Sequence, residues 1–132
     1  MASVIRLDTR GRLVIPNSIR EELDLKEGDR VMVGLSEDGE SIVVHPVAEA
    51  GKKLVKLVIE FSDKPGALSK AATYLFNEGV DLVRTQSKST RRTKTARWEV
   101  VADVSKCKHP LAEIRKGLVS KGLAARVEAK LL

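Results

Sequence analysis

Residues 4–16 read VIRLDTRGRLVIP and contain two short apolar segments on either side of a five-residue link. The pattern over 4–7 is typical of a strand, and 13–15 predicts a second one. Asp8 and Gly11 favour a turn between them, because aspartate accepts hydrogen bonds from nearby amides and glycine tolerates a positive φ. The chain is therefore expected to open with a strand, a turn and a strand.

A short helix is expected to follow this stretch, over residues 19–23. Pro16 ends the second predicted strand, since proline lacks the amide that a sheet ladder needs, and it suits the start of a helix. Ser18 and Glu21 have the spacing of a capping box, in which each side chain bonds to the other residue's amide.

Two more strands complete the first part of the chain. A turn is expected at 26–29, then strands at 31–33 and 42–44, with a hairpin signal at Glu37-Asp38-Gly39 between them. The predicted order of elements is β-β-α-β-β.

Charge and aromatic content divide the 132 residues into two parts. Residues 1–50 carry 6 Lys and Arg against 10 Asp and Glu, net −4, whereas residues 51–132 carry 18 against 8, net +10. The aromatic residues all lie in the second part; they are Phe61, Tyr74, Phe76 and Trp98. With a linker near residues 48–53, we expect two domains, residues 1–48 and 53–132.

The first part is too small to bury much apolar surface alone, so a disulfide, a metal or oligomerisation would have to stabilise it. Cys107 is the only cysteine, which excludes a disulfide within the chain. His45 and His109 are the only histidines and lie in no ligand cluster, so we expect no metal and no other cofactor. Oligomerisation remains, and it predicts an intertwined dimer.

The pattern Asp-x-x-Gly-Arg-x-x-Ile-Pro, followed by Leu-x-Leu-x-x-Gly-Asp, resembles the SpoVT/AbrB family of DNA-binding transition-state regulators and antitoxins. In this chain the pattern residues are Asp8, Gly11, Arg12, Ile15, Pro16, Leu23, Leu25, Gly28 and Asp29. The resemblance covers nearly all of the first part. It implies a swapped-hairpin dimer, in which two chains exchange strands to form one barrel-like core.

Arginines of the first strand, the turn and the helix face DNA in that family. The matching positions in this chain are Arg6, Arg12 and Arg20, and Arg10 joins them through its place in the turn. Glu21 and Glu22 follow Arg20 where some relatives have another basic residue, which weakens the positive potential of the helix. Two interpretations stay open: the arginines contact duplex DNA, or they are solvated and the motif marks only the fold.

The second part alternates between strand and helix patterns. Strands are expected at 54–61, 80–88, 94–104 and 125–132, with one helix from Leu68 to Gly79 and another from His109-Pro110 to Gly122. The order β-α-β-β-α-β predicts a ferredoxin-like fold, an antiparallel sheet with both helices on one face. The fold class of the whole chain is therefore α+β.

Within that layout, DKPGAL at residues 63–68, followed by GVDL at 79–82, resembles an ACT domain. ACT domains commonly pair and bind amino acids or similar small ligands between protomers. The resemblance implies effector-binding positions at Asp63, Gly66, Ala67, Leu68 and Asp81, the last standing where asparagine is usual. Ligand sensing and a role in assembly alone both stay open.

A basic segment at residues 88–97 is a second candidate contact for nucleic acid. Its cations are Lys88, Arg91, Arg92, Lys94 and Arg97. Such a run is commonly a solvated loop, but it could also touch flanking DNA or dock on the acidic first domain. Binding of single-stranded nucleic acid typically needs exposed aromatic residues. The sequence pattern places Tyr74, Phe76 and Trp98 at positions expected in the core, which argues against such binding.

No nucleophile–base pair or phosphate-binding glycine loop is visible, so we expect a protein that is not an enzyme. Without a long apolar run or a signal-peptide pattern, we expect a cytoplasmic protein that makes no contact with membranes. The leading hypothesis is a transcription regulator that binds double-stranded DNA as a homodimer, or as a tetramer through ACT pairing, with an amino-acid effector as a further option. The alternatives are an antitoxin and an ACT-type regulatory subunit of an enzyme.

Overall fold

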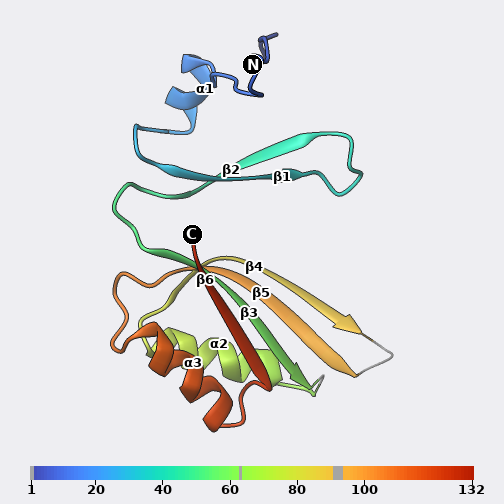
Figure 1. Cartoon of the computed structure of the whole chain (residues 1–132), viewed down its shortest axis with the longest axis vertical. Helices are drawn as coiled ribbons and strands as arrows, with labels where there is room; N and C mark the ends of the chain where they lie inside the picture. The colour runs from blue at the N-terminus through green and yellow to red at the C-terminus, as the bar shows by residue number, and fades with distance from the viewer. Residues whose placement is uncertain (1, 63, 91–93) are drawn as a thin grey trace. The chain divides into compact units, whose positions relative to one another are not determined.

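The computed structural model describes residues 2–62, 64–90 and 94–132, which divide into unit 1, Met1–Ala50, and unit 2, Gly51–Leu132 (Figure 1). The division lies inside the segment expected to be a linker. Among the described residues, no helix combines the length and the apolar character needed to cross a membrane.

Unit 1 contains helix α1, Asn17–Glu22, and strands β1, Arg30–Leu35, and β2, Ile42–Ala48. The two strands pair in antiparallel register, with Met32 opposite His45. Gly39 has φ +75° in the turn between them, a conformation that glycine adopts at little cost. The predicted hairpin of the first part is confirmed.

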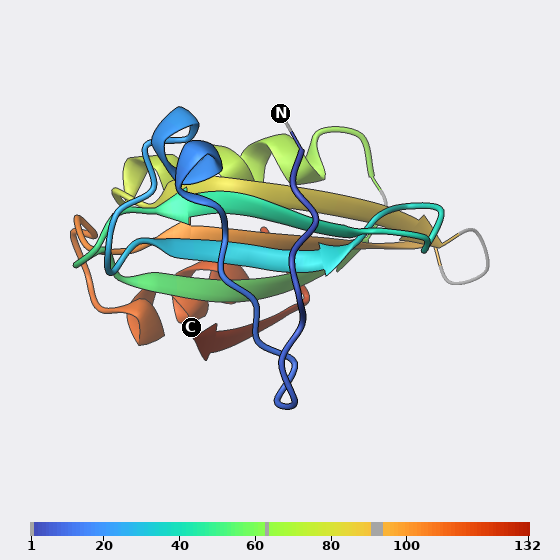
Figure 2. The ribbon, with the colours of Figure 1, turned by 90° about the horizontal axis from the view of Figure 1, so that it is seen from above.

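The segments on either side of the Asp8 turn, residues 4–7 and 13–15, form no strand, so the predicted order β-β-α-β-β is wrong for the single chain. Figure 2 shows them as irregular chain leading into and out of the turn. Strands need hydrogen bonds to a neighbour. Among the described residues, the backbone bonds between these two segments are confined to the turn, where the Asp8 amide donates to the Arg12 carbonyl at 2.9 Å. The apolar pattern requires a partner strand that unit 1 does not supply.

Helix α1 starts without the predicted capping box. Its N-cap is Pro16, no side chain caps it, and Ser18 lies inside the first turn. Because Pro16 begins the helix earlier than predicted, the Ser18 hydroxyl comes too late to serve as the cap. Glu21 instead accepts a hydrogen bond from Nδ2 of Asn17 at 2.9 Å.

None of the described residues of unit 1 is buried. Val4 and Val14 are 104% and 75% exposed, and Leu35 and Ile42 at the far end of the hairpin are exposed as well. Unit 1 thus has apolar side chains in strand patterns but no core within a single chain.

Unit 2 has the predicted order of elements. They are β3 (Leu54–Ser62), α2 (Ala67–Asn77), β4 (Asp81–Thr90), β5 (Thr95–Asp103), α3 (Leu111–Ser120) and β6 (Arg126–Leu131). The strands form an antiparallel sheet in the order β4-β5-β3-β6. Both helices cover the same face of that sheet (Figure 1). The fold is therefore mixed α+β, as predicted, and unit 2 has the ferredoxin-like layout.

A single core fills the space between this sheet and its helices. β3 contributes Val55, Leu57, Ile59 and Phe61, the alternating face that the sequence predicts. Ala71 and Leu75 of α2, and Ile114 and Leu118 of α3, are buried against it. Each large aliphatic side chain removed from water stabilises the fold by roughly 1.5–3 kcal/mol, so unit 2 has the core that unit 1 lacks.

Phe76 lies outside this core, and its expected core position was wrong. Its side chain is 77% exposed, whereas Trp98 is 3% exposed. Successive helix residues are about 100° apart around the axis, so turning Leu75 toward the sheet carries Phe76 away from it. The argument against single-stranded nucleic acid therefore loses one of its three aromatic residues.

Candidate nucleic-acid interface

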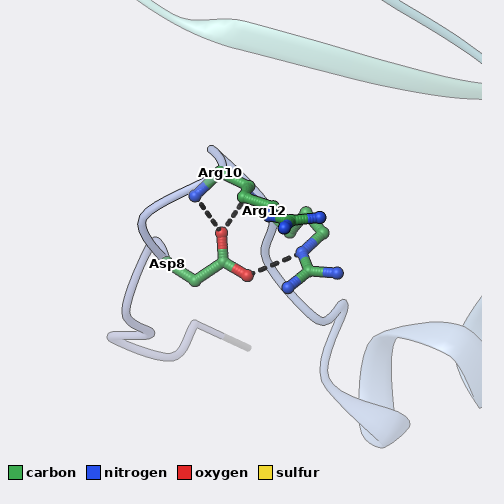
Figure 3. A network of polar contacts seen from close by, with 3 residues as sticks. All are labelled: Asp8, Arg10 and Arg12. Atoms are coloured by element: carbon green, nitrogen blue, oxygen red, sulfur yellow. Dashed lines mark hydrogen bonds and ion pairs between the residues drawn. The ribbon is translucent and has the colours of Figure 1, made fainter.

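The carboxylate of Asp8 is the centre of the turn at residues 8–12 (Figure 3). Its Oδ1 atom accepts the backbone amides of Arg10 and Arg12, each at 2.8 Å. Its Oδ2 atom accepts Nε of Arg12 at 2.7 Å. Gly11, with φ +74°, completes the turn and donates its amide to the Asp8 carbonyl at 3.1 Å. The aspartate therefore fixes both the backbone of the turn and one of its arginine side chains.

These hydrogen bonds also keep Asp8 charged. The backbone amide of Arg12, then its guanidinium group, and finally the amide of Arg10 lower the pKa of the Asp8 carboxyl below its usual value. Only Nε of Arg12 is joined to Asp8 (Figure 3), and no hydrogen bond among the described residues engages its two terminal nitrogens. The Arg12 side chain is 71% exposed, so these nitrogens are open to a ligand.

Arg10 differs from Arg12 in its electrostatic surroundings. Its backbone amide is bound to Asp8, but its side chain is exposed and has no acidic partner among the described residues. Arg10 therefore presents an uncompensated charge next to the compensated one of Arg12.

The other two predicted arginines lie on neighbouring segments. Arg6 is exposed on the irregular segment 4–7, and Arg20 is exposed in the last turn of α1, where its Nη2 donates to Asn17 at 3.4 Å. Arg20 also lines a hollow of about 510 Å³ whose apolar walls are Ile15, Leu25 and Val31. In the part of the chain that is described, no hydrogen bond or ion pair joins Arg6 or Arg20 to the turn, so the structure brings together only Arg10 and Arg12.

The described residues of the basic segment, 88–90 and 94–97, lie at the end of β4 and around the start of β5. Arg91 and Arg92 lie outside the described residues. Lys88 and Arg97 are opposite each other in the register, an arrangement of like charges that is unfavourable. An ion pair of 3.2 Å between Arg97 and Glu99 offsets that repulsion. Contact of this segment with DNA stays a prediction.

The predicted effector residues lie at two ends of α2. Gly66, with φ +83°, is its N-cap, Ala67 and Leu68 begin it, and Asp63 lies outside the described residues. Asp81 begins β4 after the other end of the helix. An eleven-residue helix is roughly 16 Å long, so a single chain does not place Asp81 beside Gly66.

A cavity of about 350 Å³ lies next to the start of α2. It is lined by Phe61, Ser62, Lys64, Pro65, Ala67, Lys70 and residues 122–125. The sequence reasoning missed Lys70 and the 122–125 loop, because only the tertiary fold brings that loop to the start of α2. The two lysines give the cavity a positive character that suits a carboxylate.

A second feature that the sequence reasoning missed joins the end of α2 to the start of α3. Nδ1 of His109 lies 2.6 Å from Oε2 of Glu78, and the Lys108 amide donates to the Glu78 carbonyl at 2.9 Å. Glu78, through its hydrogen bond and its charge, raises the pKa of His109. No sequence signal pairs these residues, because they are 31 positions apart.

Residues 4–52 match a known protein-family model. That family is described as "Antidote-toxin recognition MazE, bacterial antitoxin". The match covers unit 1 but less than half of the chain, and it supports the similarity of this part to regulators and antitoxins of the SpoVT/AbrB type. No protein with curated annotation is similar in sequence to the chain.

Two solved structures are similar to part of the chain. A formyltetrahydrofolate deformylase from Pseudomonas syringae pv. tomato is 14% identical, with a TM-score of 0.51 over 60% of this chain and 28% of that one. The enzyme of the same name from Pseudomonas putida is 18% identical, with a TM-score of 0.48 over 59% of this chain and 28% of that one. The first likeness shows the fold alone, and this chain spans only 28% of the deformylase.

Proposed function

We propose that the chain is a DNA-binding regulator that acts as a dimer or a higher oligomer, with unit 1 as the part that contacts duplex DNA. The observation that carries this proposal is the Asp8 turn, which presents the side chains of Arg10 and Arg12 to solvent. Arginine is well suited to this task, because its planar set of donors matches both phosphate oxygens and base edges. The proposal assigns no catalytic activity to the chain.

The proposed dimer rests on what unit 1 lacks in a single chain. Segments 4–7 and 13–15 have no strand partner, and no described residue of the unit is buried. A second copy that exchanges these segments supplies both the missing hydrogen bonds and the missing core, including cover for the apolar hollow beside α1. The two-fold axis of such a dimer places two copies of the arginine turn on one assembly.

The salt dependence of duplex binding tests the proposed arginine face. Residues 1–50 carry a net charge of −4, so attraction to DNA has to come from the local placement of Arg6, Arg10, Arg12 and Arg20. If the arginines of a dimer neutralise about six to eight phosphates, log K against log salt has a slope between about −5 and −7, from roughly −0.9 per phosphate.

Fluorescence anisotropy with a labelled duplex over a series of salt concentrations measures that slope. Arg6→Ala and Arg12→Ala should weaken binding. Arg126→Ala serves as a matched control, because Arg126 is exposed on unit 2, pairs with Glu128 at 2.6 Å and lies outside the proposed interface. A flat salt response, or equal affinities of all three variants, contradicts the DNA-binding role of unit 1.

An antitoxin is the second candidate function, and the family description of residues 4–52 favours it. In that case the chain neutralises a toxin as well as binding DNA. The test starts from a protein that co-purifies with this chain in fixed stoichiometry. That protein is expressed alone and then together with this chain, and cell growth is measured in both cases. Toxicity that disappears on co-expression supports the antitoxin role, whereas a partner that is harmless alone argues against it.

Unit 2 is proposed to assemble the oligomer and to bind a small carboxylate-bearing ligand beside α2. Lys64 and Lys70 supply positive charge, and the first-turn amides of α2 have no side-chain cap. A thermal-shift screen of the common amino acids tests this, since a ligand that binds only the folded state raises the melting temperature. If no amino acid raises the melting temperature, unit 2 serves in assembly alone. If an amino acid binds but the chain binds no DNA, a regulatory subunit of an enzyme is favoured instead.

A further inference from the structure

We infer that Asp8 is a positioning residue for DNA recognition, which holds Arg12 so that its terminal nitrogens contact a base edge while Arg10 contacts phosphate. This inference rests on the proposed function and adds to it a division of labour within one turn. Arg12 then provides sequence specificity, and Arg10 provides affinity for any duplex.

The first observation is that Asp8 holds Arg12 at two points. One carboxylate oxygen binds the Arg12 amide at 2.8 Å, and the other binds its Nε at 2.7 Å (Figure 3). The side chain is thus fixed at its backbone end and at its guanidinium group. An arginine held in this way loses less conformational freedom on binding than a free one, which is the general advantage of preorganisation.

The second observation concerns charge. Asp8 and Arg12 form an ion pair with no net charge. The hydrogen bond from the Arg12 backbone amide keeps the carboxylate beside the guanidinium group. Such a pair attracts a distant phosphate only weakly, but its remaining N–H groups keep their direction. Two parallel donors at the end of a guanidinium group match the O6 and N7 acceptors of guanine in the major groove.

Arg10 is the natural counterpart. Its side chain has no carboxylate partner among the described residues, so its full charge is available to a phosphate. Phosphate contacts of this kind release counterions and carry no sequence information. The turn therefore contains one arginine of each kind, two residues apart.

The β1–β2 turn provides a matched control for the aspartate. Asp38 accepts the backbone amide of Glu40 at 2.9 Å and the hydroxyl of Ser36, and no arginine among the described residues pairs with it. Its surroundings also lower the pKa of its carboxyl, first through the Ser36 hydroxyl and then through the Glu40 amide. Asp38→Asn removes the same charge from a similar turn of the same unit without touching a guanidinium group.

The experiment uses the full-length chain and two labelled duplexes. One is a sequence that the unaltered chain enriches from a random pool, and the other is the same duplex with its base order shuffled. Dissociation constants and salt slopes are measured for Asp8→Asn, Arg12→Lys, Arg10→Ala and the control Asp38→Asn. The preference for the enriched duplex is the ratio of the two dissociation constants.

In Asp8→Asn and Arg12→Lys, we expect that preference to fall at least about tenfold, since a bidentate contact to a base discriminates by roughly one to two orders of magnitude. Asp8→Asn should bind the shuffled duplex at least as tightly as before, because a negative charge is lost. In Arg10→Ala both duplexes should lose affinity equally, with the salt slope reduced by about 0.9 for each lost phosphate contact. Asp38→Asn should leave the preference unchanged.

Three results overturn the inference: an unchanged preference in Arg12→Lys, an equal loss for both duplexes in a folded Asp8→Asn, or the same drop in Asp38→Asn. Asp8→Asn could lower the melting temperature too far for binding to be measured. In that case Arg12→Lys tests the inference, because it leaves the hydrogen bonds from the backbone amides to Asp8 intact. An unaltered chain that binds every duplex equally refutes this inference alone. An unaltered chain that binds no duplex refutes the proposed function itself.

Discussion

At the scale of single residues, two acidic residues hold chain segments in place through hydrogen bonds. Asp8 gathers two amides and a guanidinium group in unit 1. In unit 2, Glu78 holds the loop before α3 through His109 and the Lys108 amide. The Asp8 carboxylate binds backbone and side chain together, whereas Glu78 uses its carboxylate for His109 and its backbone carbonyl for the Lys108 amide.

The pair of Glu78 and His109 predicts a pH-dependent stability of unit 2. Glu78 raises the pKa of His109 in the folded state above the value of 6.5 for the free group. A raised folded pKa adds stability that is fully present below the unfolded pKa and is lost as the pH rises through the folded one. We therefore expect the melting temperature of the unaltered chain to exceed that of His109→Asn near pH 6, and to approach it under alkaline conditions.

Paired melting curves of the two proteins across this pH range measure the effect. His45→Asn is the control, because this histidine lies in β2 of unit 1 and has no described acidic partner. A difference between the unaltered chain and His109→Asn that is independent of pH would show that the ion pair contributes nothing.

The turn at Asp8 was predictable from the sequence, because its hydrogen bonds span only a few residues. The position of Phe76 was not, since its apolar side chain and helical spacing fit a core face equally well. Only the rotation of α2 that buries Ala71 and Leu75 decides between the two positions. Hydrogen bonds between residues close in the sequence could thus be inferred from the local sequence, whereas the burial of a side chain depended on how the helix packs.

At the scale of elements, helix ends decide how unit 2 is assembled. Gly79 has φ +82° after α2, and Gly122 has φ +68° after α3. A Cβ atom built on Gly79 would lie 2.5 Å from the Lys106 carbonyl oxygen, whereas one on Gly122 would meet nothing within 4 Å. The first glycine therefore serves both a backbone conformation and a close approach of two chain segments.

This contrast predicts two different costs for the same substitution. Gly122→Ala should destabilise unit 2 by about 1 kcal/mol, the penalty of a left-handed conformation with a side chain. Gly79→Ala should cost about 1–3 kcal/mol more, because the Lys106 carbonyl must also move. Urea unfolding followed by the fluorescence of buried Trp98 measures both; equal costs would mean that the loop gives way freely.

The elements of unit 2 were predictable because each strand finds its neighbour within the same chain. The β1–β2 hairpin was predictable for the same reason. Residues 4–7 and 13–15 carry an equally clear strand pattern, but a pattern states only that a partner is needed. Only the tertiary structure shows whether the same chain provides that partner. In this structure the single chain provides none to residues 4–7 and 13–15.

At the scale of the whole molecule, the two units have different sources of stability. Unit 2 encloses a core of buried residues from β3, β5, α2 and α3. Unit 1 buries none of its described residues and leaves large apolar side chains exposed. If unit 1 forms the proposed dimer, stability measured on the full chain should combine a contribution from the core of unit 2 with one that depends on a second copy.

A single polar substitution on the exposed apolar surface tests that dependence. Val14 is 75% exposed in the single chain, so Val14→Asp would ordinarily change stability by less than about 0.5 kcal/mol. If a second chain covers Val14, the buried charge instead breaks that interface. We expect the mass of the assembly to fall to half or less of its original value.

Light scattering coupled to size-exclusion chromatography measures that mass against the 14.5 kDa of one chain. Leu131→Asp is the matched control, because Leu131 is 70% exposed at the end of unit 2. An unchanged mass together with an unchanged melting curve for Val14→Asp would mean that this surface stays in contact with water.

The absence of a core in unit 1 has a consequence for the cell as well as for the fold. A unit that becomes ordered only by joining a second copy has a stability that is inseparable from the concentration of the chain. The amount of competent unit 1 then rises with the square of the chain concentration when the chain is scarce. Under the proposed dimer, newly made, unpaired chains would also offer an exposed apolar segment to proteases, so the same feature would set a threshold for activity and a route for clearance.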